Sequence, residues 1–275
     1  MKEKHILVLG GTGKTGRRVA SRLEQQKIPF RIGSRNAPLP FDWHHPSTWR
    51  PVLESASSVY LAFAPDLAAP GTTHIIADFL EVAKDAGVAQ MVLLSGRGEP
   101  EAQACENLVI QSGIPWTVLR CSWFFQNFSE SFLLEGIREG AVYLPVGPVL
   151  EPFVDAEDIA DAAVAALTMP DRHQGRIYEI TGPALMRFED AIARIGKKSG
   201  RKIPYHTIPL AVYVAALKKA NLPDDMIQLV TYLFTEVLDG RNASLATGIQ
   251  EALGRAPRSF EDYLERTAPT GIWDL

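Results

Sequence analysis

The stretch Ile6-Leu7-Val8-Leu9-Gly10-Gly11-Thr12-Gly13-Lys14-Thr15-Gly16 decides the fold. Its four apolar residues predict a short buried strand, and three glycines at a GxxGxxG spacing follow directly. Beyond them, Val19, Ala20 and Leu23 recur at the spacing of one helix face. The N-terminus of such a helix attracts phosphate, because its free N–H groups and positive dipole end face the anion. The stretch therefore predicts the pyrophosphate site of a dinucleotide cofactor.

The segment Gly13-Lys14-Thr15 also resembles the end of a P-loop, GxxxxGK[ST], which is typical of ATPases and kinases. That pattern requires a glycine five positions before Gly13, where this chain has Val8. The spacing therefore excludes a P-loop. We expect Lys14 to lie beside the cofactor phosphates instead.

Composition narrows the class of protein. The chain has 275 residues, 46% of them hydrophobic and 22% charged, which is ordinary for a globular enzyme with one large core. The net charge of −4 and the absence of a basic tract argue against a nucleic-acid partner. No apolar run approaches membrane-spanning length, and Cys105 and Cys121 form no CxxC motif. We expect a cytoplasmic monomer or homodimer that binds a small molecule and holds no metal; His44 and His45 lack metal-ligand partners.

Short apolar strands alternate with helical segments over the first two thirds of the chain. This alternation predicts a Rossmann-type α/β fold with a doubly wound parallel sheet. The expected strands are Ile6–Leu9, Phe30–Ile32, Ser58–Ala62, Met91–Leu94, Trp116–Leu119 and Ile177–Ile180. Right-handed crossovers place their carboxyl ends at one edge, where ligands bind. That edge would carry Gly10, Gly33, Phe63, Ser95 and Cys121.

After Gly182 the pattern changes to helices separated by prolines. The expected helices are Phe188–Ser199, Leu210–Ala220, Asp224–Leu238 and Ser259–Ala268. This part is too short for a second large core. We therefore expect a cofactor-binding domain over residues 1–182, including a pocket-forming segment near 123–150, and a small helical substrate-binding cap over residues 183–275.

The second expected strand indicates which nicotinamide cofactor binds. NAD-specific folds place an acidic residue at its end for the ribose 2′-hydroxyl, but no acid occurs between Pro29 and Phe41. Ser34 and Arg35 stand there instead. A 2′-phosphate would gain about 1.5–3 kcal/mol from such a charged donor, which is roughly a tenfold to hundredfold preference for NADP(H).

Several motifs together resemble one family. They are Leu7–Gly16, Phe41-Asp42-Trp43, Trp116–Arg120, Trp123–Phe128, Phe153-Val154-Asp155 with Asp158-Ile159-Ala160, and Leu253–Asp262. The chain resembles the NmrA-like atypical short-chain dehydrogenases, and within them the ergot alkaloid dehydrogenase branch. The resemblance extends over essentially the whole chain.

The resemblance implies a role for individual positions. Gly10 and Thr12 to Gly16 (Thr12, Gly13, Lys14, Thr15, Gly16) would hold the pyrophosphate, Ser34 and Arg35 the 2′-phosphate, and Asp42 and Trp43 the adenine. The ribose and nicotinamide would lie beside Phe63, Ala64, Pro65, Ser95 and Cys121. The substrate pocket would be lined by Trp123, Phe125, Asn127 and Phe128. These aromatic residues are equally compatible with core packing.

The segment after Ser95 constrains the chemistry. Ordinary short-chain dehydrogenases protonate a carbonyl oxygen with a Tyr-x-x-x-Lys pair, and neither residue occurs between Gly96 and Asn107. Ser95 is the catalytic candidate, but alone it is a poor acid. Three functions remain: an NADPH-dependent reductase of an iminium acceptor, which needs no enzyme acid, a quinone reductase, or a non-enzymatic NADP(H) sensor that binds a protein partner.

Overall fold

The computed structural model describes residues 4–275, which divide into two compact units. The first unit comprises residues up to Cys121 together with Ala156–Ile180 and Thr247–Ala256. The second comprises Ser122–Asp155, Thr181–Ala246 and Pro257–Leu275. Each unit is thus assembled from separate stretches of the chain.

The first unit is built on a six-stranded sheet in which every pair of adjacent strands runs parallel. The order β2-β1-β3-β4-β5-β7 confirms the predicted Rossmann-type topology. The strands are β1 His5–Leu9, β2 Phe30–Gly33, β3 Ala56–Leu61, β4 Gln90–Gly96, β5 Trp116–Cys121 and β7 Arg176–Ile180. Because all of them run the same way, their carboxyl ends lie at one edge.

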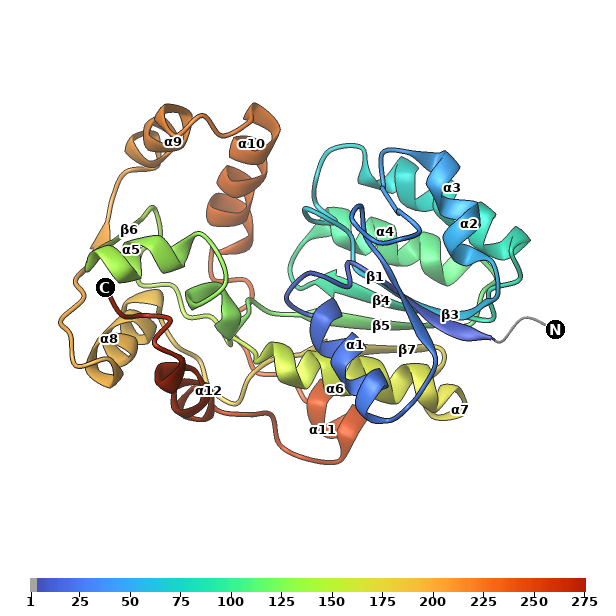
Figure 1. The fold of residues 1–275 in the computed structure, drawn as a ribbon. Helices are drawn as coiled ribbons and strands as arrows, with labels where there is room; N and C mark the ends of the chain where they lie inside the picture. Colours follow the sequence, from blue (N-terminus) through green and yellow to red (C-terminus); the bar gives the residue numbers. More distant parts are fainter. Residues whose placement is uncertain (1–3) are drawn as a thin grey trace. The chain divides into compact units, whose positions relative to one another are not determined.

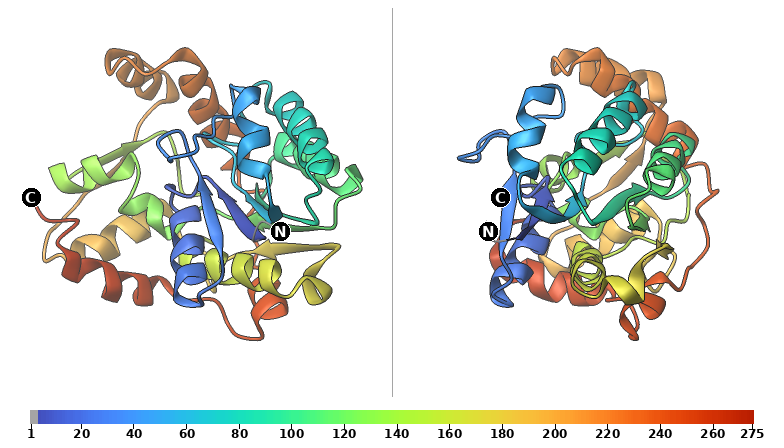
Figure 2. Two further views of the ribbon diagram at one scale, coloured as in Figure 1. Left: turned by 45° about the vertical axis from the view of Figure 1, so that its right-hand side comes forward. Right: turned by 90° about the vertical axis from the view of Figure 1, so that its right-hand side faces the viewer.

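Helices cover both faces of this sheet (Figure 1). One face carries α2 (Trp49–Leu53), α3 (Thr72–Asp85) and α4 (Pro100–Gln111), and the other carries α1 (Gly16–Gln25) and α6 (Ala156–Thr168). The short elements of the unit are η1 (Pro46–Thr48), α7 (Pro170–His173) and α11 (Gly248–Leu253). The views in Figure 2 show the same three layers. Coverage of both faces explains why the strands are continuous apolar runs.

Apolar side chains hold the layers of the first unit together. Leu7 and Leu9 of β1 and Leu93 of β4 are fully buried and pack in one cluster with Phe79 of α3. Burying a large apolar side chain contributes about 1.5–3 kcal/mol. The same packing fixes where each strand ends, and so where the functional side chains lie.

The second unit is mainly helical. Its helices are η2 (Phe125–Phe128), α5 (Leu133–Glu139), α8 (Phe188–Lys198), α9 (Leu210–Lys219), α10 (Asp224–Tyr232), α12 (Phe260–Thr267) and η4 (Ala268–Thr270). The predicted helix Asp224–Leu238 is correct as far as Tyr232, and Leu233–Val237 then forms a π-helical turn. A two-stranded parallel sheet of β6 (Val142–Leu144) and β8 (Tyr205–Thr207) was not foreseen, since each strand has only three residues.

Candidate cofactor site

The glycine turn between β1 and α1 is shaped by close backbone approaches. Gly10 has a φ of +65°, and its carbonyl accepts a 2.8 Å hydrogen bond from the Gly13 amide. A Cβ on Gly16 would lie 2.2 Å from the Gly10 carbonyl oxygen, so no side chain fits at the start of α1. A Cβ on Gly11 would lie 2.6 Å from Cγ2 of Ile32. These contacts require glycine at three of the four turn positions that have it.

Gly13 completes the cradle differently. A Cβ there would meet only the Gly10 carbonyl, at 3.2 Å, and Gly13 and Thr12 are both exposed. The bare backbone of the turn is therefore presented outward, directly before α1, which is ten residues long. The Arg18 guanidinium donates a 2.7 Å hydrogen bond to the Lys14 carbonyl and braces the turn from behind. This geometry fits a pyrophosphate held by backbone N–H groups at a helix N-terminus.

Ser34 and Arg35 follow β2 directly. The Ser34 carbonyl accepts hydrogen bonds from the amides of Ala37 and Phe41, which fold the following segment into a compact turn. Arg35 is exposed, and its guanidinium contacts no other residue within 4–275 by hydrogen bond or ion pair. A free guanidinium fork beside the end of β2 suits a phosphate ester.

Asp42 and Trp43 have different surroundings. The Asp42 carboxylate accepts a 2.9 Å hydrogen bond from the His44 amide and lies 3.1 Å from Nδ1 of His45. The hydrogen bond from the His44 amide, followed by His45, holds the pKa of Asp42 below its usual value. Trp43 is only 7% exposed, and its ring lies 4.8 Å from both Phe41 and Phe63. Trp43 therefore belongs to the core at this edge.

The segment after β3 lies more openly. Phe63 is half-buried against Trp43, whereas Ala64 and Pro65 are exposed and joined by a cis peptide bond. Asp66 follows, and its carboxylate accepts a 2.9 Å hydrogen bond from the Ala68 amide. The exposed pair can border a ligand, while Asp66 turns back into the protein.

Ser95 lies near the end of β4 with its hydroxyl committed to a carboxylate. It is 4% exposed and donates a 2.6 Å hydrogen bond to Oε1 of Glu106. Arg120 binds both oxygens of Glu106, at 3.0 and 2.5 Å, and binds Glu179 at 3.0 Å. Arg97 binds the other oxygen of Glu179 at 3.2 Å. Sequence reasoning missed this network, since its members come from β4, α4, β5 and β7.

A second group that sequence reasoning missed is Glu99, in the loop between β4 and α4. It is 7% exposed, and its carboxyl group lies near that of Asp66. Burial and then the charge of Asp66 raise the pKa of Glu99 to about 9. Within residues 4–275, Oε2 of Glu99 receives no hydrogen-bond donor. No sequence motif marks Glu99, which follows Gly96 by three residues, as a functional residue.

Cys121 ends β5 and is 5% exposed. Its sulfur contacts the Leu119 carbonyl at 3.5 Å, and burial raises the pKa of the thiol far above its usual value. A buried thiol that stays protonated is a poor nucleophile. Cys121 can therefore contribute packing at the end of β5, and it does not serve as a nucleophile.

The four aromatic and amide positions expected in a pocket all lie in the second unit. Phe125 and Phe128 are 2% and 0% exposed and pack in its core, so they contribute packing, the alternative left open by the sequence. Asn127 is half-buried, with its backbone amide bonded to the Phe124 carbonyl. Trp123 is half-buried, and its ring stacks on Phe234 at 5.8 Å.

A buried carboxylate lies behind Trp123. Glu151 is 1% exposed, and its Oε1 lies 3.4 Å from the Trp123 amide nitrogen, which donates to it. The carboxylate thus contacts the backbone of Trp123, and the face of the Trp123 ring is the group here that can attract a positively charged ligand.

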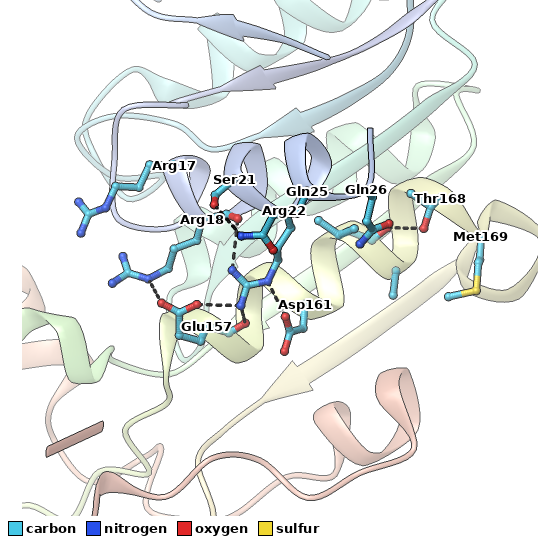
Figure 3. Close-up of a pocket in the computed structure, with 12 residues that line it drawn as sticks. Arg17, Arg18, Ser21, Arg22, Gln25, Gln26, Glu157, Asp161, Thr168 and Met169 are labelled. Atoms are coloured by element: carbon cyan, nitrogen blue, oxygen red, sulfur yellow. Dashed lines mark hydrogen bonds and ion pairs between the residues drawn. The ribbon is translucent and has the colours of Figure 1, made fainter. Parts of the chain in front are cut away.

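A surface groove of about 980 Å³ lies elsewhere in the first unit, along α1 and α6. Figure 3 shows that Arg18 and Arg22 of α1 reach Glu157 and Asp161 of α6 across it. These four charges neutralise one another at 2.5–2.7 Å. The groove follows the contact between the two helices, which ion pairs bridge, and it does not include the glycine turn.

The described part of the chain has neither a metal site nor a helix that could span a membrane. Over residues 4–275 there is no group of three His, Cys, Asp or Glu side chains placed to hold a metal ion. None of the helices described in that range is long and apolar enough to cross a membrane.

Comparison with known proteins places the chain in a family. Residues 102–264 match the model of the NmrA-like family. The chain belongs to the NmrA-like family. It is 32% identical to agroclavine dehydrogenase of Claviceps fusiformis, over 94% of this chain and 96% of that protein. It is 29% identical to prestalk A differentiation protein A of Dictyostelium discoideum, over 95% of this chain and 92% of that protein.

The fold has solved counterparts. An NADPH-dependent quinone oxidoreductase from Escherichia coli, crystallised with NADPH, superposes with a TM-score of 0.78. The match covers 95% of this NmrA-like chain and 99% of the other, at 19% identity. At that identity the likeness concerns the fold alone.

Proposed function

We propose that this NmrA-like protein is an NADP(H)-dependent oxidoreductase that reduces a small organic acceptor. The glycine cradle carries the proposal, because its backbone is bare where a pyrophosphate binds and a Cβ on Gly16 would collide at 2.2 Å. Arg35, which follows β2 and has no hydrogen-bond or ion-pair partner among the described residues, supports a 2′-phosphate, and hence NADP(H) over NAD(H). The cofactor would supply or accept the hydride.

For the acceptor we favour a cyclic iminium ion. Its nitrogen already carries the positive charge that hydride neutralises, so no Tyr-x-x-x-Lys pair is needed. The half-buried ring of Trp123 suits such a cation, because an aromatic face attracts positive charge. The similarity to agroclavine dehydrogenase, at 32% identity, supports the same class of acceptor.

In this scheme the protein acts mainly by orientation and charge. The backbone of the glycine turn holds the phosphates, and Ser34 and Arg35 select the 2′-phosphate. In the second unit, the ring of Trp123 would attract the positive charge of an acceptor. Correct placement of two reactants alone supplies about 7–11 kcal/mol of the barrier.

A second candidate function is an NADP(H) sensor that binds a protein partner. The Ser95 hydroxyl is tied to Glu106 at 2.6 Å, which leaves it no free role in proton transfer. One relative, at 29% identity, is named as a differentiation protein. A quinone reductase is a third, enzymatic alternative with the same cofactor.

The test is NADPH oxidation measured by absorbance against a panel of cyclic iminium ions, quinones and aldehydes. We expect turnover with the iminium ions and a lower rate with NADH. Tight NADPH binding without turnover of any acceptor would contradict the enzyme and favour the sensor. Failure to bind NADPH at all would overturn both.

A further inference from the structure

The buried carboxyl pair of Asp66 and Glu99 lies at the same sheet edge as the proposed cofactor site. Asp66 follows β3 by five residues, and Glu99 follows β4 by three. Since β3 and β4 are adjacent and parallel, their carboxyl ends lie side by side. The pair thus joins two loops of the edge where ligands bind in this fold.

Gly96 places the Glu99 carboxyl against the end of β4. A Cβ on Gly96 would lie 2.3 Å from the carboxyl carbon of Glu99 and 2.3 and 2.4 Å from its oxygens. The Glu99 carboxyl therefore lies beside the backbone of Gly96, one residue beyond Ser95. Glu99 is 7% exposed, so its side chain is buried there and does not extend into solvent.

The burial of the two carboxyl groups favours a proton on the pair. Two carboxylates buried near each other repel, and a single proton on one of them relieves the repulsion. Oε2 of Glu99 is buried and receives no N–H or O–H donor from the described residues, whereas Asp66 accepts from the Ala68 amide. Burial raises the pKa of Asp66 as well, but the Ala68 amide favours its charged form, so the proton resides on Glu99.

The surroundings keep that proton in place at neutral pH. Burial, the charge of Asp66, and then Glu101 and Glu106 of α4 all raise the pKa of Glu99, to about 9. Cys105 of α4 stays protonated, because burial and then the charges of Glu106 and Asp66 raise its pKa to about 11. Arg120 of β5 is bound to Glu106, which it neutralises.

We propose that the Asp66–Glu99 pair is the proton source of the reductase, which extends its acceptors to those whose oxygen or nitrogen must be protonated, such as quinones. This inference rests on the proposed function. For each hydride that the acceptor takes at one atom, it takes one proton from the pair at another. The pair passes from one shared proton to none and recovers a proton from water through Asp66, which is half-buried next to the exposed Pro65.

The first test needs no cofactor. Infrared spectroscopy of the wild-type protein at pH 7 should show a protonated carboxyl band that is lost in Glu99→Gln and retained in Glu101→Gln, the matched control from the exposed first turn of α4. The band should titrate away as the pH rises past about 9. A spectrum in which Glu99→Gln removes no such band overturns the inference.

Unfolding offers an independent readout of the same proton. The pKa of Glu99 is higher in the folded than in the unfolded chain, so its stabilisation is complete below the unfolded pKa and is lost as pH rises through the folded one. Between about pH 5 and pH 8 the unfolding constant of the wild type, relative to Glu99→Gln, should rise roughly tenfold per pH unit. Equal pH dependences would contradict a buried proton.

The activity test uses one acceptor of each kind. With a benzoquinone and NADPH, Glu99→Gln should lose roughly 100-fold in kcat, as expected for removal of a general acid. With a cyclic iminium ion, which needs no proton, its kcat should remain within about twofold of the wild type. If Glu99→Gln folds poorly, Asp66→Asn provides a second test. It should shift the alkaline limb of the pH–rate profile for the quinone to lower pH, because one charge that raises the pKa of Glu99 is gone.

The outcomes separate the two proposals. If the wild type reduces the quinone and Glu99→Gln reduces it equally well, the proton source is wrong and the reductase stands. If the wild type oxidises NADPH with neither acceptor, the reductase is wrong, and the infrared band then reports a buried acid with another role.

Discussion

The carboxyl ends of β1 and β4 meet the needs of a ligand site in opposite ways. The turn after β1 has no side chains at its glycines, so bare backbone is presented outward, and a Cβ on Gly16 would collide at 2.2 Å. The end of β4 carries polar side chains that bind one another, from Ser95 of β4 through Glu106 of α4 to Arg120 of β5. The first arrangement suits binding, and the second suits control of charge and protons.

We expect the largest effect on stability from a substitution that removes the cation of the polar network at the end of β4. Arg120→Met leaves the Glu106 carboxylate, which is 2% exposed, without its cation. We expect a loss of about 3–5 kcal/mol in the free energy of unfolding, because a buried charge is left uncompensated. Urea unfolding measures it. Arg194→Met, which removes a half-exposed ion pair with Glu261, is the control and should cost under about 1 kcal/mol. Equal losses would show that the network is not special.

On the binding side, Arg35→Ala should act on affinity without acting on stability. The guanidinium is exposed and unpaired within residues 4–275, so nothing in the fold depends on it. We expect NADPH affinity to fall by roughly tenfold to a hundredfold, which corresponds to about 1.5–3 kcal/mol, while NADH affinity stays constant. Titration calorimetry measures both. Arg50→Ala, at an exposed arginine of α2, should change neither. An unchanged NADPH affinity in Arg35→Ala would contradict the 2′-phosphate role.

Gly16→Ala tests whether the bare backbone itself matters. The added Cβ would push on the Gly10 carbonyl, and overpacking of this kind costs about 1–3 kcal/mol. We expect a lower melting temperature together with weaker NADPH binding. Gly147→Ala is a matched control, since a Cβ there meets nothing within 4 Å. A variant with normal binding would mean that the turn tolerates distortion.

Asp42→Asn should have the smallest effect. The folded chain lowers the pKa of Asp42, so its contribution to stability is present above the unfolded pKa, about 3.9, and is lost as the pH falls through the folded value. The carboxylate is 25% exposed, so we expect only about 0.5 kcal/mol at neutral pH, vanishing in acid. Thermal unfolding at pH 7 and pH 3 measures the difference. A constant difference between the two would refute the assignment to Asp42.

The same contrast explains what the sequence could predict. The predicted strands are correct within two residues at every end, because short apolar runs carry a local signal. The glycine turn is equally local, since its contacts join residues no more than six positions apart, except for those with Ile32 and Ala62. A binding element made of contiguous backbone can therefore be predicted from the sequence.

The contacts between polar side chains from different elements could not be predicted from the sequence. Glu106 lies eleven residues from Ser95 and fourteen from Arg120, and only the register of β4 against β5 brings Ser95 opposite Arg120. Asp66 and Glu99 come from different loops, and each reads as an ordinary surface acid. For Phe125 and Phe128 the sequence leaves a pocket role and core packing equally open, and the structure buries both side chains, as it does Trp43. Burial depends on packing between distant elements, which local patterns do not encode.

The five points where the chain passes from one unit to the other have a consequence for how such a protein diversifies. Residues 247–256 return to the first unit, where α11 packs on β7, and a Cβ on Gly248 would lie 2.2 Å from the Glu179 carbonyl oxygen. No single cut of the gene therefore separates one unit from the other. An exchange of one continuous stretch of the gene therefore cannot replace the whole second unit.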